Sequence, residues 1–375
     1  MTTDGNQAVT LILGIETSCD ETAASVVENG RVVRSNVVAS QDALHERYGG
    51  VVPEIASRAH IERIGPVIDD ALRIAGVEFN QLDAIAVGNR PGLIGSLLVG
   101  VSAAKAMAWS AGKPLIGIDH VRAHLYAASL LDGSGSPVTL RENAPNEPET
   151  QYPALGLVVS GGHTSLYELD APTELRLIGR TIDDAVGEAY DKAAVILQLG
   201  YPGGPKLDLL AQTGDANAYK LPRSLLNKQS LDFSFSGLKT ALLYTVRGYP
   251  KRRGDESYFE KSADELTDRQ RRDMAASFQA AAIDALIIKL RRAHDQMAGG
   301  GRKPESLIIG GGVSANSLLR QRVVELGGEL GLCVHLPRMA YCLDNAAMIA
   351  GLADHEFRLG HFDDLSLPAV ATISS

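Results

Sequence analysis

The stretch TLILGIETSCDETAASVVENGRVV, residues 10–33, carries the clearest structural signal in the chain. An apolar run rich in β-branched residues leads into the polar turn ETSCDET, and a second apolar run follows that turn. Asn29 and Gly30 interrupt the second run, and Asn-Gly between apolar segments is a strong sign of a β-hairpin. The stretch therefore predicts strands that fold back on each other, with the carboxylates of Glu16, Asp20 and Glu21 in the first turn.

The order of predicted elements occurs twice along the chain. ALGLVVSGGHTSLYELD, residues 154–170, again joins two apolar runs through a polar turn. After the first motif, the hydrophobic spacing predicts a long helix, a strand, a second helix, a strand and a third helix, at residues 53–75, 83–87, 96–109, 114–118 and from 120 onward. The matching segments after the second motif are residues 268–297, 306–309, 317–326, 333–337 and 344–355.

This duplication favours an α/β protein of two pseudo-equivalent lobes with a central cleft, the plan of the actin, Hsp70 and sugar-kinase ATPase fold. In that plan the two hairpin turns hold phosphates from opposite sides. A single doubly wound sheet is the alternative. We expect a first α/β lobe, a mobile connecting loop, a second α/β lobe with a helical insertion, and a C-terminal helical segment that bridges back to the first lobe. The expected bounds are residues 1–131, 132–151, 152–343 (insertion about 179–262) and 344–375.

Composition narrows the class of protein. The 375 residues are 45% hydrophobic and 22% charged, as in an ordinary globular protein. A net charge of −9 is unlike that of a chain that grips nucleic acid by itself. If RNA is a substrate, a local patch or a partner must supply the positive charge. The candidate patches are the basic runs at residues 247–253, 269–272 and 289–292, and ordinary solvated faces are the alternative.

The cysteines and the apolar stretches bear on the compartment. Cys19, Cys333 and Cys342 have no paired spacing, which argues against a disulfide scaffold and for a reducing environment. The N-terminus MTTDGNQAVT has neither the basic nor the long apolar region of a signal peptide. The apolar stretch at residues 93–109 is interrupted by Gly, Ser and Lys105, so we expect no membrane span and a cytoplasmic protein.

His120 and His124, in DHVRAHLYAA, stand four residues apart. On a helix this spacing places both imidazoles on one face, as two ligands of one metal ion require. Asp119 precedes them at the expected helix start, where an acidic residue caps well. The internal repeat places CLDNAAM opposite this segment, so Asp344 is expected to complete a His-His-carboxylate set with open coordination positions. Capping or surface roles for the two histidines are the alternative.

The residue after His120 argues against a peptidase. In zinc peptidases with two histidines at this spacing, a Glu directly follows the first His and acts as general base. The corresponding residue here is Val121. Hydrolysis of peptides is therefore not expected of this site.

Two glycine-containing turns are candidate anion sites. In VVSGGHT, Gly161 and Gly162 lack Cβ atoms, so successive N–H groups can close on an anionic oxygen; a tight turn without ligand is the alternative. In GGGVSANSLLR, a strand and three glycines precede a helix that starts near Asn316, which suits backbone packed against a nucleoside. The carboxylates of ETSCDET are expected either to orient a metal-bound phosphate or to satisfy the N–H groups of their own turn.

The insertion adds further candidate positions. DDAVGEAYDKAA places Asp191 and Lys192 on an amphipathic helix, and YPGGPKLD places Gly203, Gly204 and Asp208 on a turn. An acidic residue there is suited to holding ribose hydroxyls. The alternative is a helix cap followed by an ordinary turn.

Ten segments of the chain together resemble one family. They are GIETSCDETAASV, SRAHIERIGPVIDDAL, PGLIGSLLVG, DHVRAHLYA, LVVSGGHT, DDAVGEAYDKAA, YPGGP, FSFSGLKTALL, GGGVSAN and YCLDNAAMIA. The family is that of the universal tRNA N6-adenosine threonylcarbamoyltransferases of the bacterial TsaD type, long mislabelled O-sialoglycoprotein endopeptidases. The resemblance runs over about residues 11–353, nearly the whole chain.

The resemblance implies an enzyme that moves the threonylcarbamoyl group from threonylcarbamoyl-AMP to the N6 amine of the adenosine following the anticodon (position 37) in tRNAs that read codons beginning with A. It implies one divalent metal ion per subunit, iron rather than zinc, held by His120, His124 and Asp344, with the adenylate or ATP in the cleft. The implied partners are tRNA, a catalytically inactive paralogue and a small ATPase. The implied adenylate contacts are Val158, Val159, Ser160, Gly161, Gly162, Asp191, Gly204, Asp208 and Asn316.

This chain departs from the family's usual pattern in two places. Small residues usually precede Pro-Gly-Leu, whereas Asn89 and Arg90 stand here, and the loop at residues 132–151 is longer than usual. The catalytic proton acceptor is not identified, and Glu16 is the candidate because its turn is expected to face the cleft. An actin-like ATPase or small-molecule kinase, and a non-catalytic scaffold of a tRNA-modifying complex, are the alternative functions.

Overall fold

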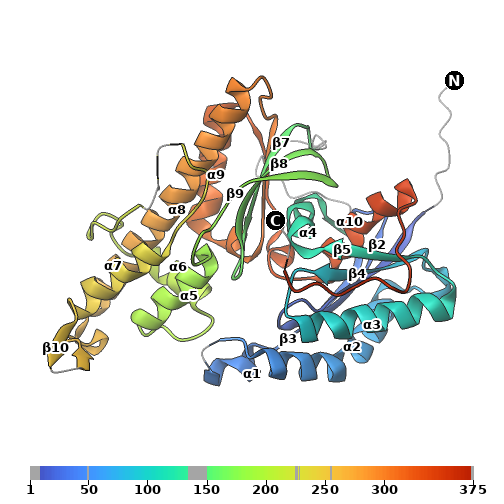
Figure 1. The fold of residues 1–375 in the computed structure, drawn as a ribbon, viewed down its shortest axis with the longest axis horizontal. Coiled ribbons are helices and arrows are strands. Elements are labelled where there is room, and N and C mark those ends of the chain that lie inside the picture. The colour runs from blue at the N-terminus through green and yellow to red at the C-terminus, as the bar shows by residue number, and fades with distance from the viewer. Residues whose placement is uncertain are drawn as a thin grey trace. The chain divides into compact units, whose positions relative to one another are not determined.

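The computed structural model describes residues 9–48, 50–133, 150–223, 227, 229–253 and 256–372. The chain divides into two units, unit 1 with Met1–Glu147 and Pro337–Ser375 and unit 2 with Pro148–Leu336. Most of the expected connecting loop, residues 132–151, lies outside the described residues. Figure 1 shows the elements of each unit.

The described strands of unit 1 form one sheet in the order β5-β4-β1-β2-β3-β6. β1, β4 and β5 run parallel, whereas β2 is antiparallel to both β1 and β3. Asn29 and Gly30 join β2 to β3 with φ of +49° and +70°, the left-handed conformation that the predicted Asn-Gly turn requires. The strands are β1 (Leu11–Glu16), β2 (Glu21–Glu28), β3 (Val32–Ser40), β4 (Ala84–Arg90), β5 (Leu115–Asp119) and β6 (Leu131–Asp132).

The sheet of unit 2 repeats this plan. Its order is β13-β12-β7-β8-β9, which matches β5-β4-β1-β2-β3 strand for strand and in direction. The predicted duplication of the fold is therefore confirmed. The strands are β7 (Ala154–Val159), β8 (Thr164–Ala171), β9 (Glu174–Arg180), β12 (Ser306–Gly310) and β13 (Cys333–His335), with a separate ribbon of β10 (Lys251–Arg253) and β11 (Glu256–Tyr258).

Helices follow the strands in both units. Unit 1 contains α1 (Asp42–His45), α2 (Pro53–Ala75), α3 (Ile94–Ala111), α4 (His120–Tyr126) and α10 (Ala346–Leu359). Unit 2 contains α5 (Val186–Ile196), α6 (Gly203–Ala211), α7 (Ser236–Arg247), α8 (Asp268–Gly299) and α9 (Ser317–Leu330). Short 3-10 turns are η1 (Glu46–Tyr48), η2 (Phe79–Gln81), η3 (Ala127–Ser129), η4 (Ala263–Glu265), η5 (Gly312–Ala315) and η6 (Met339–Tyr341).

Both faces of the unit 1 sheet are buried. Leu13 on β1 belongs to the core formed with α2 and α3, whereas Ile12 belongs to the core formed with α10. Gly14 lies on the α10 side, where a Cβ atom would overlap the backbone of Ala346 and Ala350. A glycine is needed there because only a residue without a side chain lets α10 pack directly on β1. This close packing brings the segment before α10 to the sheet.

Helix α3 has the length and composition of a membrane-spanning helix, with a mean hydropathy of 1.3 and 33% of its residues buried. In unit 1 it packs instead on β4 and α2. The apolar side chains of Ile94, Leu98 and Trp109 remain exposed on its outer face. A helix that covers a sheet can be as long and as apolar as a membrane-spanning helix.

Helix α6 corrects one expectation from the sequence. The sequence predicts Gly203, Gly204 and Asp208 on a turn, but the structure places all three in α6. The sequence Gly-Gly-Pro resembles a turn because these residues disfavour helix interiors. In the first turn of a helix they are tolerated, since the first N–H groups have no acceptor within the helix.

Candidate functional site

The first part of the site is the beginning of α4. β5 ends at Asp119, whose Oδ1 accepts hydrogen bonds from the backbone N–H of Val121 (3.0 Å) and Arg122 (3.1 Å). The predicted cap is thus confirmed, and the helix starts at His120. The helical spacing places the rings of His120 and His124 on one face, edge to face with centroids 4.6 Å apart. Both histidines are buried.

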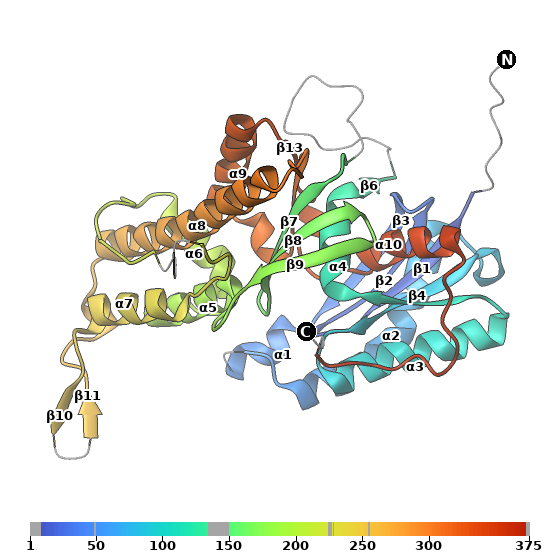
Figure 2. The same ribbon diagram turned by 45° about the horizontal axis from the view of Figure 1, so that its top comes forward.

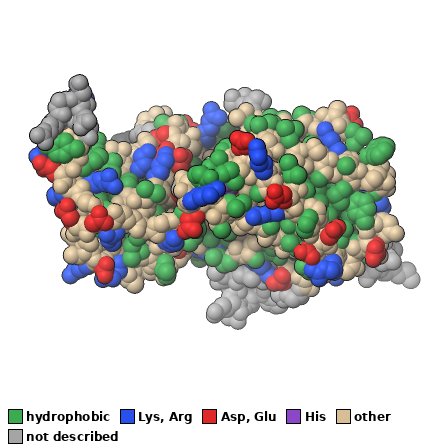
Figure 3. All heavy atoms as spheres, turned by 90° about the horizontal axis from the view of Figure 1, so that it is seen from below, with side chains coloured by type: hydrophobic (Ala, Val, Ile, Leu, Met, Phe, Trp, Pro, Cys, Tyr) green, Lys and Arg blue, Asp and Glu red, His purple; other side chains and the backbone are tan. Residues whose placement is uncertain are grey.

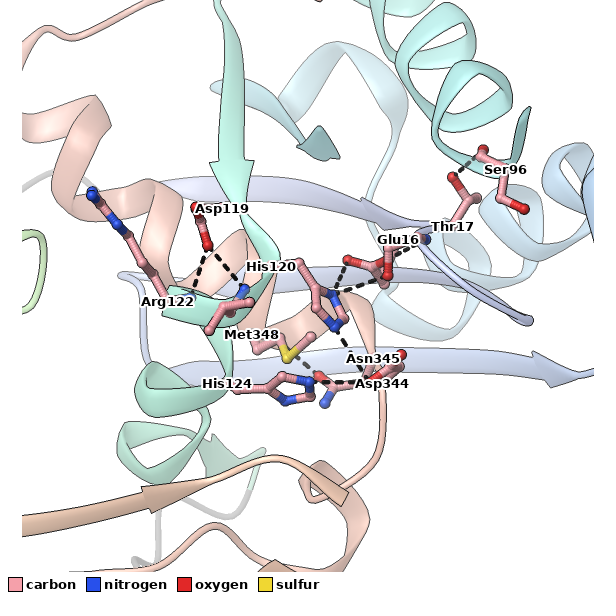
Figure 4. Close-up of polar contacts among 12 residues, drawn as sticks. Glu16, Thr17, Ser96, Asp119, His120, Arg122, His124, Asp344, Asn345 and Met348 are labelled. Atoms are coloured by element: carbon pink, nitrogen blue, oxygen red, sulfur yellow. Dashed lines mark hydrogen bonds and ion pairs between the residues drawn. The ribbon is translucent and has the colours of Figure 1, made fainter. Parts of the chain in front are cut away.

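Asp344 reaches the two histidines from the segment before α10. Its Oδ1 lies 3.1 Å from Nε2 of His124 and 3.6 Å from Nε2 of His120. Asn345 caps α10 by accepting a hydrogen bond from the N–H of Met348, which fixes where the preceding carboxylate lies. Figure 4 shows both rings and the carboxylate pointing toward one another. The three potential ligand atoms all lie within 4.8 Å of one another.

The donor set fits a divalent metal ion. Both ring nitrogens of His124 are buried; Nδ1 makes no hydrogen bond to a described residue, and Nε2 lies 3.1 Å from Oδ1 of Asp344. A buried polar atom without a hydrogen bond is destabilising by about 1–3 kcal/mol unless something else binds it. Two imidazoles and one carboxylate that converge on a point form a three-ligand set with open positions, which suits iron or zinc.

Glu16 lies directly behind His120. It has no exposed surface, and its Oε2 is 3.0 Å from Nδ1 of His120. The same nitrogen is 3.2 Å from Oγ of Ser18, and Oε1 of Glu16 accepts a 2.5 Å hydrogen bond from the N–H of Ser18. When the proton of His120 is on Nδ1, this N–H donates a hydrogen bond to Glu16. The lone pair of Nε2 then points toward Asp344.

Space for Glu16 depends on Gly88 of β4. A Cβ atom at Gly88 would lie 2.5 Å from Oε2 of Glu16. The sequence suggests Glu16 as a candidate proton acceptor but does not show that it contacts His120. The available signal was the strand order, because β1 and β5 flank β4 and their carboxyl ends meet at one edge of the sheet.

The electrostatics of the two histidines differ. Burial lowers the pKa of His120, but the carboxylates of Glu16 and Asp344 more than offset this and raise its pKa to about 9. Burial and the neighbouring charge of His120 lower the pKa of His124. The surrounding carboxylates therefore stabilise a positive charge on His120. That charge in turn disfavours a second positive charge on His124.

The other carboxylates of the first turn lie elsewhere. Asp20 and Glu21 come together with Asp42 at the start of α1, with their oxygens within 4.8 Å of one another. Burial and the charges of Asp344 and Asp20 raise the pKa of Glu21 well above its usual range. The turn thus separates Glu16, which faces His120, from an acidic group beside α1.

The equivalent turn of unit 2 contains the predicted glycines. The N–H of Ser160 donates to the carbonyl of His163 at 2.8 Å, which closes the turn after β7. Gly161 and Gly162 are exposed, and a Cβ atom on either would meet no protein atom. The tightly packed glycine is Gly187 on α5, where a Cβ atom would lie 2.6 Å from the carbonyl oxygen of Ser160. The turn therefore rests on the start of α5 and leaves open space above its glycines.

The remaining predicted contacts join helix ends of unit 2. Asp191 Oδ1 accepts hydrogen bonds from the N–H groups of Gly203 (3.0 Å) and Gly204 (3.2 Å) at the start of α6. Asp208 accepts from the hydroxyl and the N–H of Ser317 at the start of α9 (2.7 and 3.1 Å). Asp191 and Asp208 thus fix the starts of α6 and α9, whether or not they also contact a ligand.

Asn316 and the valines complete this group. Asn316 caps α9 by accepting from the N–H of Leu319 at 3.0 Å. Gly311, with φ of +91°, packs so closely on β7 that a Cβ atom would lie 2.5 Å from the carbonyl oxygen of Val159. Val158 and Val159 are fully buried, so only their backbone is available to a ligand.

The duplicated sheets define an α/β protein of the actin-like ATPase fold. The crystal structure of HypF from T. kodakarensis matches this chain with a TM-score of 0.56 at 15% identity, over 96% of this chain and 49% of that one. A full-length HypF in a phosphate- and nucleotide-bound form matches with a TM-score of 0.55 at 12% identity, over 94% of this chain and 47% of that one. At these identities the likeness concerns the fold alone.

The sequence relatives identify the family. A sequence model described as tRNA N6-adenosine threonylcarbamoyltransferase matches residues 32–351. Proteins of that name from Trichlorobacter lovleyi and Symbiobacterium thermophilum are 46% and 48% identical to this chain, over 96% of it and over 96% and 95% of their own lengths. The chain belongs to the tRNA N6-adenosine threonylcarbamoyltransferase family and is a transferase. The predictions of fold class, family and enzyme class are thereby confirmed.

Proposed function

We propose that the protein transfers the threonylcarbamoyl group from threonylcarbamoyl-AMP to N6 of the adenosine at position 37, in tRNAs that read codons beginning with A. Membership of the transferase family supports this reaction. The observation that carries the proposal is the convergence of the buried rings of His120 and His124 with the carboxylate of Asp344. An actin-like ATPase or a small-molecule kinase has little need of such a donor set.

His120, His124 and Asp344 would hold one divalent metal ion, which we propose is iron rather than zinc. When bound, such an ion acts as a Lewis acid on phosphate or carboxylate oxygens of the substrate. Glu16 and Ser18 orient the ring of His120 from behind. We assign Glu16 this positioning role rather than proton transfer, because both of its oxygens are already engaged.

The residues of unit 2 would bind the adenylate or ATP. The open space above Gly161 and Gly162 supports a phosphate position, since backbone N–H groups of such a turn stabilise negative charge on the leaving group. Asp191, Gly204, Asp208 and Asn316 would shape the nucleoside position through the starts of α6 and α9. Val158, Val159 and Ser160 would contribute backbone only.

The proposed reaction is an acyl transfer. N6 of the adenosine attacks the carbamoyl carbon, the bond from that carbon to the phosphate oxygen breaks, AMP leaves with the electron pair, and N6 loses one proton. Because an aromatic amine is a weak nucleophile, orientation of the two substrates supplies much of the acceleration. The chain's own contribution is to orient both substrates and to stabilise charge on the phosphate.

Contact with tRNA is proposed at the ribbon β10–β11. In the other two basic runs, one cation each is engaged within unit 2: Arg271 donates to the carbonyls of Leu197 and Ala263, and Lys289 is buried against the carbonyl of Ser230. The ribbon extends beyond α7 in Figures 1 and 2. On the face seen in Figure 3, Lys and Arg side chains are interspersed with Asp and Glu side chains.

The ribbon has the composition of an RNA contact. Lys251 lies directly opposite Tyr258 in the antiparallel register, which places a cation beside an aromatic ring on one face. Tyr249 is 77% exposed and its ring lies against that of Tyr244. Lys251 also pairs with Glu260, but an exposed ion pair of this kind is weak and exchanges readily. Exposed aromatic rings interleaved with cations are the usual means of holding unpaired bases.

We further propose that the protein acts in the cytoplasm with an inactive paralogue and a small ATPase, as the family resemblance implies. The net charge of −9 supports a need for partners in binding tRNA.

Reconstitution tests the proposed function. The complete system contains threonine, bicarbonate, ATP, the adenylate-forming enzyme, partner proteins and tRNA, and mass spectrometry detects the modified nucleoside. We expect modification with the natural chain, loss of more than about 100-fold with His120→Ala, and no loss with the control Asp69→Ala, at an exposed position of α2 in the same unit. Equal yields from all three proteins would contradict the metal centre, and no modification by the natural chain would contradict the reaction.

A further inference from the structure

The chain after α10 forms a tail along the edge of the unit 1 sheet. Residues 360–372 contain no helix, and Figures 1 and 2 show them running back from α10 across unit 1. The N–H of Asp363 donates to the carbonyl of Leu115 at 2.8 Å, and its Oδ2 accepts from the N–H of Gly117 at 2.7 Å. The tail thus pairs with the outer strand β5.

One side chain anchors the tail in the core. Leu367 is only 6% exposed and packs with the hydrophobic residues between the sheet and α2 and α3. It occupies the space that a side chain at Gly117 would fill, because a Cβ atom there would lie 2.7 Å from Leu367 Cδ1. Leu365, two residues earlier, is 50% exposed. The two leucines therefore form a matched buried and exposed pair.

Beyond Leu367, the tail binds residues 89–92, the end of β4 and the start of the connection to α3, which we call the loop 89–92. Asn89 is buried, and its Nδ2 donates to the carbonyl of Pro368 at 3.0 Å while its own carbonyl accepts from the N–H of Val370 at 2.9 Å. The N–H of Gly92 donates to the carbonyl of Ala371 at 3.2 Å. Both ends of the loop 89–92 are thus fixed by the tail.

The loop contacts the groups around His120 by two routes. Nε of Arg90 lies 3.5 Å from Oδ2 of Asp119, the residue that caps α4 at His120. Gly92 packs on Ser18 so closely that a Cβ atom would lie 2.5 Å from the Ser18 carbonyl oxygen. The hydroxyl of Ser18 in turn lies 3.2 Å from Nδ1 of His120. Asn89 and Arg90 are therefore both members of this chain of contacts.

We propose that the C-terminal tail, residues 361–371, is a positioning element for the His120 site. It holds the loop 89–92, and that loop holds the helix cap and the serine that orient the His120 ring. The inference rests on the proposed metal centre. A tail that detaches lets the loop relax, so the three ligands adopt the binding arrangement for a smaller fraction of the time. The apparent dissociation constant for a metal ion then rises in inverse proportion to that fraction.

Cobalt(II) binding to the metal-free full-length protein tests the proposal. Competition titration gives the affinity, and the visible absorption of bound cobalt(II) reports the ligand geometry. We expect Leu367→Ala to weaken cobalt(II) binding by about 3- to 10-fold and to alter the visible spectrum, a smaller effect than the 10- to 100-fold typical of groups that touch the ligands themselves. Leu365→Ala is the control and should match the natural chain, and Leu367→Met should restore most of the affinity.

A second variant guards against simple loss of folding. Val370→Pro removes the N–H that donates to Asn89 without opening a cavity, and it should weaken cobalt(II) binding in the same direction. Unchanged affinity and spectrum in folded Leu367→Ala and Val370→Pro proteins would overturn the positioning role. If the proposed metal centre is wrong, the result is different. The natural chain would then bind no cobalt(II), or the His120→Ala variant would bind it as tightly as the natural chain does.

Discussion

Glu16 stands at the end of β1 with no exposed surface, and both of its oxygens are engaged. One oxygen fixes the turn through the N–H of Ser18, and the other fixes the ring of His120. A carboxylate behind a ligating imidazole sets its tautomer and strengthens it as a donor. At the scale of residues, the site therefore consists of the three converging side chains together with the carboxylate behind them.

Replacement of Glu16 tests this arrangement. Glu16→Gln keeps the shape but removes the charge that holds the proton on Nδ1, so we expect metal affinity to fall by about 10- to 100-fold with little change in Tm. Glu62→Gln, the same change at an exposed position of α2, is the control. Competition titration with cobalt(II) measures both, and equal affinities for the two variants would exclude the positioning role.

At the scale of elements, helix starts in unit 2 are held by carboxylates from other segments. Asp183 binds the start of α7 through the N–H groups of Phe235 (2.8 Å) and Ser236 (3.3 Å) and through the Ser236 hydroxyl (3.1 Å). Burial acts to raise the pKa of Asp183, but the hydroxyl of Ser234 together with the donors of Phe235 and Ser236 more than offsets it and lowers the pKa below its ordinary value. Asp191 and Asp208 likewise accept hydrogen bonds from backbone N–H groups at the starts of α6 and α9.

The lowered pKa of Asp183 gives a prediction with a definite sign. Because the folded pKa lies below the unfolded value of about 4, the ionised carboxylate stabilises the fold above that pH and the stabilisation is lost as the pH falls through the folded pKa. Asp183→Asn should lower Tm by about 2–4 °C at pH 7, as expected for loss of one helix cap. The difference from the natural chain should shrink toward zero in strong acid.

Thermal melts between neutral pH and strong acid measure this difference. Asp69→Asn, at an exposed position of α2, is the control and should leave Tm nearly unchanged throughout. A Tm difference that stays constant down to acid pH would show that the Asp183 charge is not what holds α7.

At the scale of the whole molecule, an acidic protein acts on a polyanion. With a net charge of −9, its interaction with tRNA cannot come from an overall field of the right sign. The exposed ribbon β10–β11 has cations and aromatic rings close together. It extends away from the other elements of unit 2 and is therefore accessible. Long-range repulsion combined with local attraction makes binding strongly dependent on salt.

Charge reversal on the ribbon tests the tRNA contact. The double variant Lys251→Glu, Arg252→Glu should weaken tRNA binding by about tenfold or more and reduce the slope of affinity against salt by roughly 1–2. Arg58→Glu with Arg73→Glu on α2 changes the net charge equally and is the control. Filter binding over a range of salt concentrations measures both. Equal losses would mean that net charge, not the ribbon, sets the affinity, and retained tRNA binding with lost partner binding would assign the ribbon to a protein contact.

Local pattern was sufficient for the elements and for much of the site. The period of the apolar residues gives α2 at Pro53–Ala75 as predicted, the Asn-Gly pair gives the turn after β2, and Asp119 caps the helix of His120 and His124 as predicted. The duplicated order of these patterns gives the two sheets of equal topology. These features depend on backbone geometry and on contacts between residues near in sequence, which a sequence displays directly.

The internal repeat led to the expectation that Asp344 lies near the histidines, but the contacts that bring distant segments together depend on packing. The distance between Glu16 and His120 follows from the order β5-β4-β1 and from the space at Gly88, while the proximity of Asp344 requires α10 to pack on Gly14. The start of α6 at Gly203 depends on an acceptor supplied by Asp191, twelve residues earlier. The sequence by itself established the family, the elements and the histidine pair. The tertiary structure established what stands behind His120 and what the C-terminal tail holds, because burial and close approach arise only when remote parts of the chain pack together.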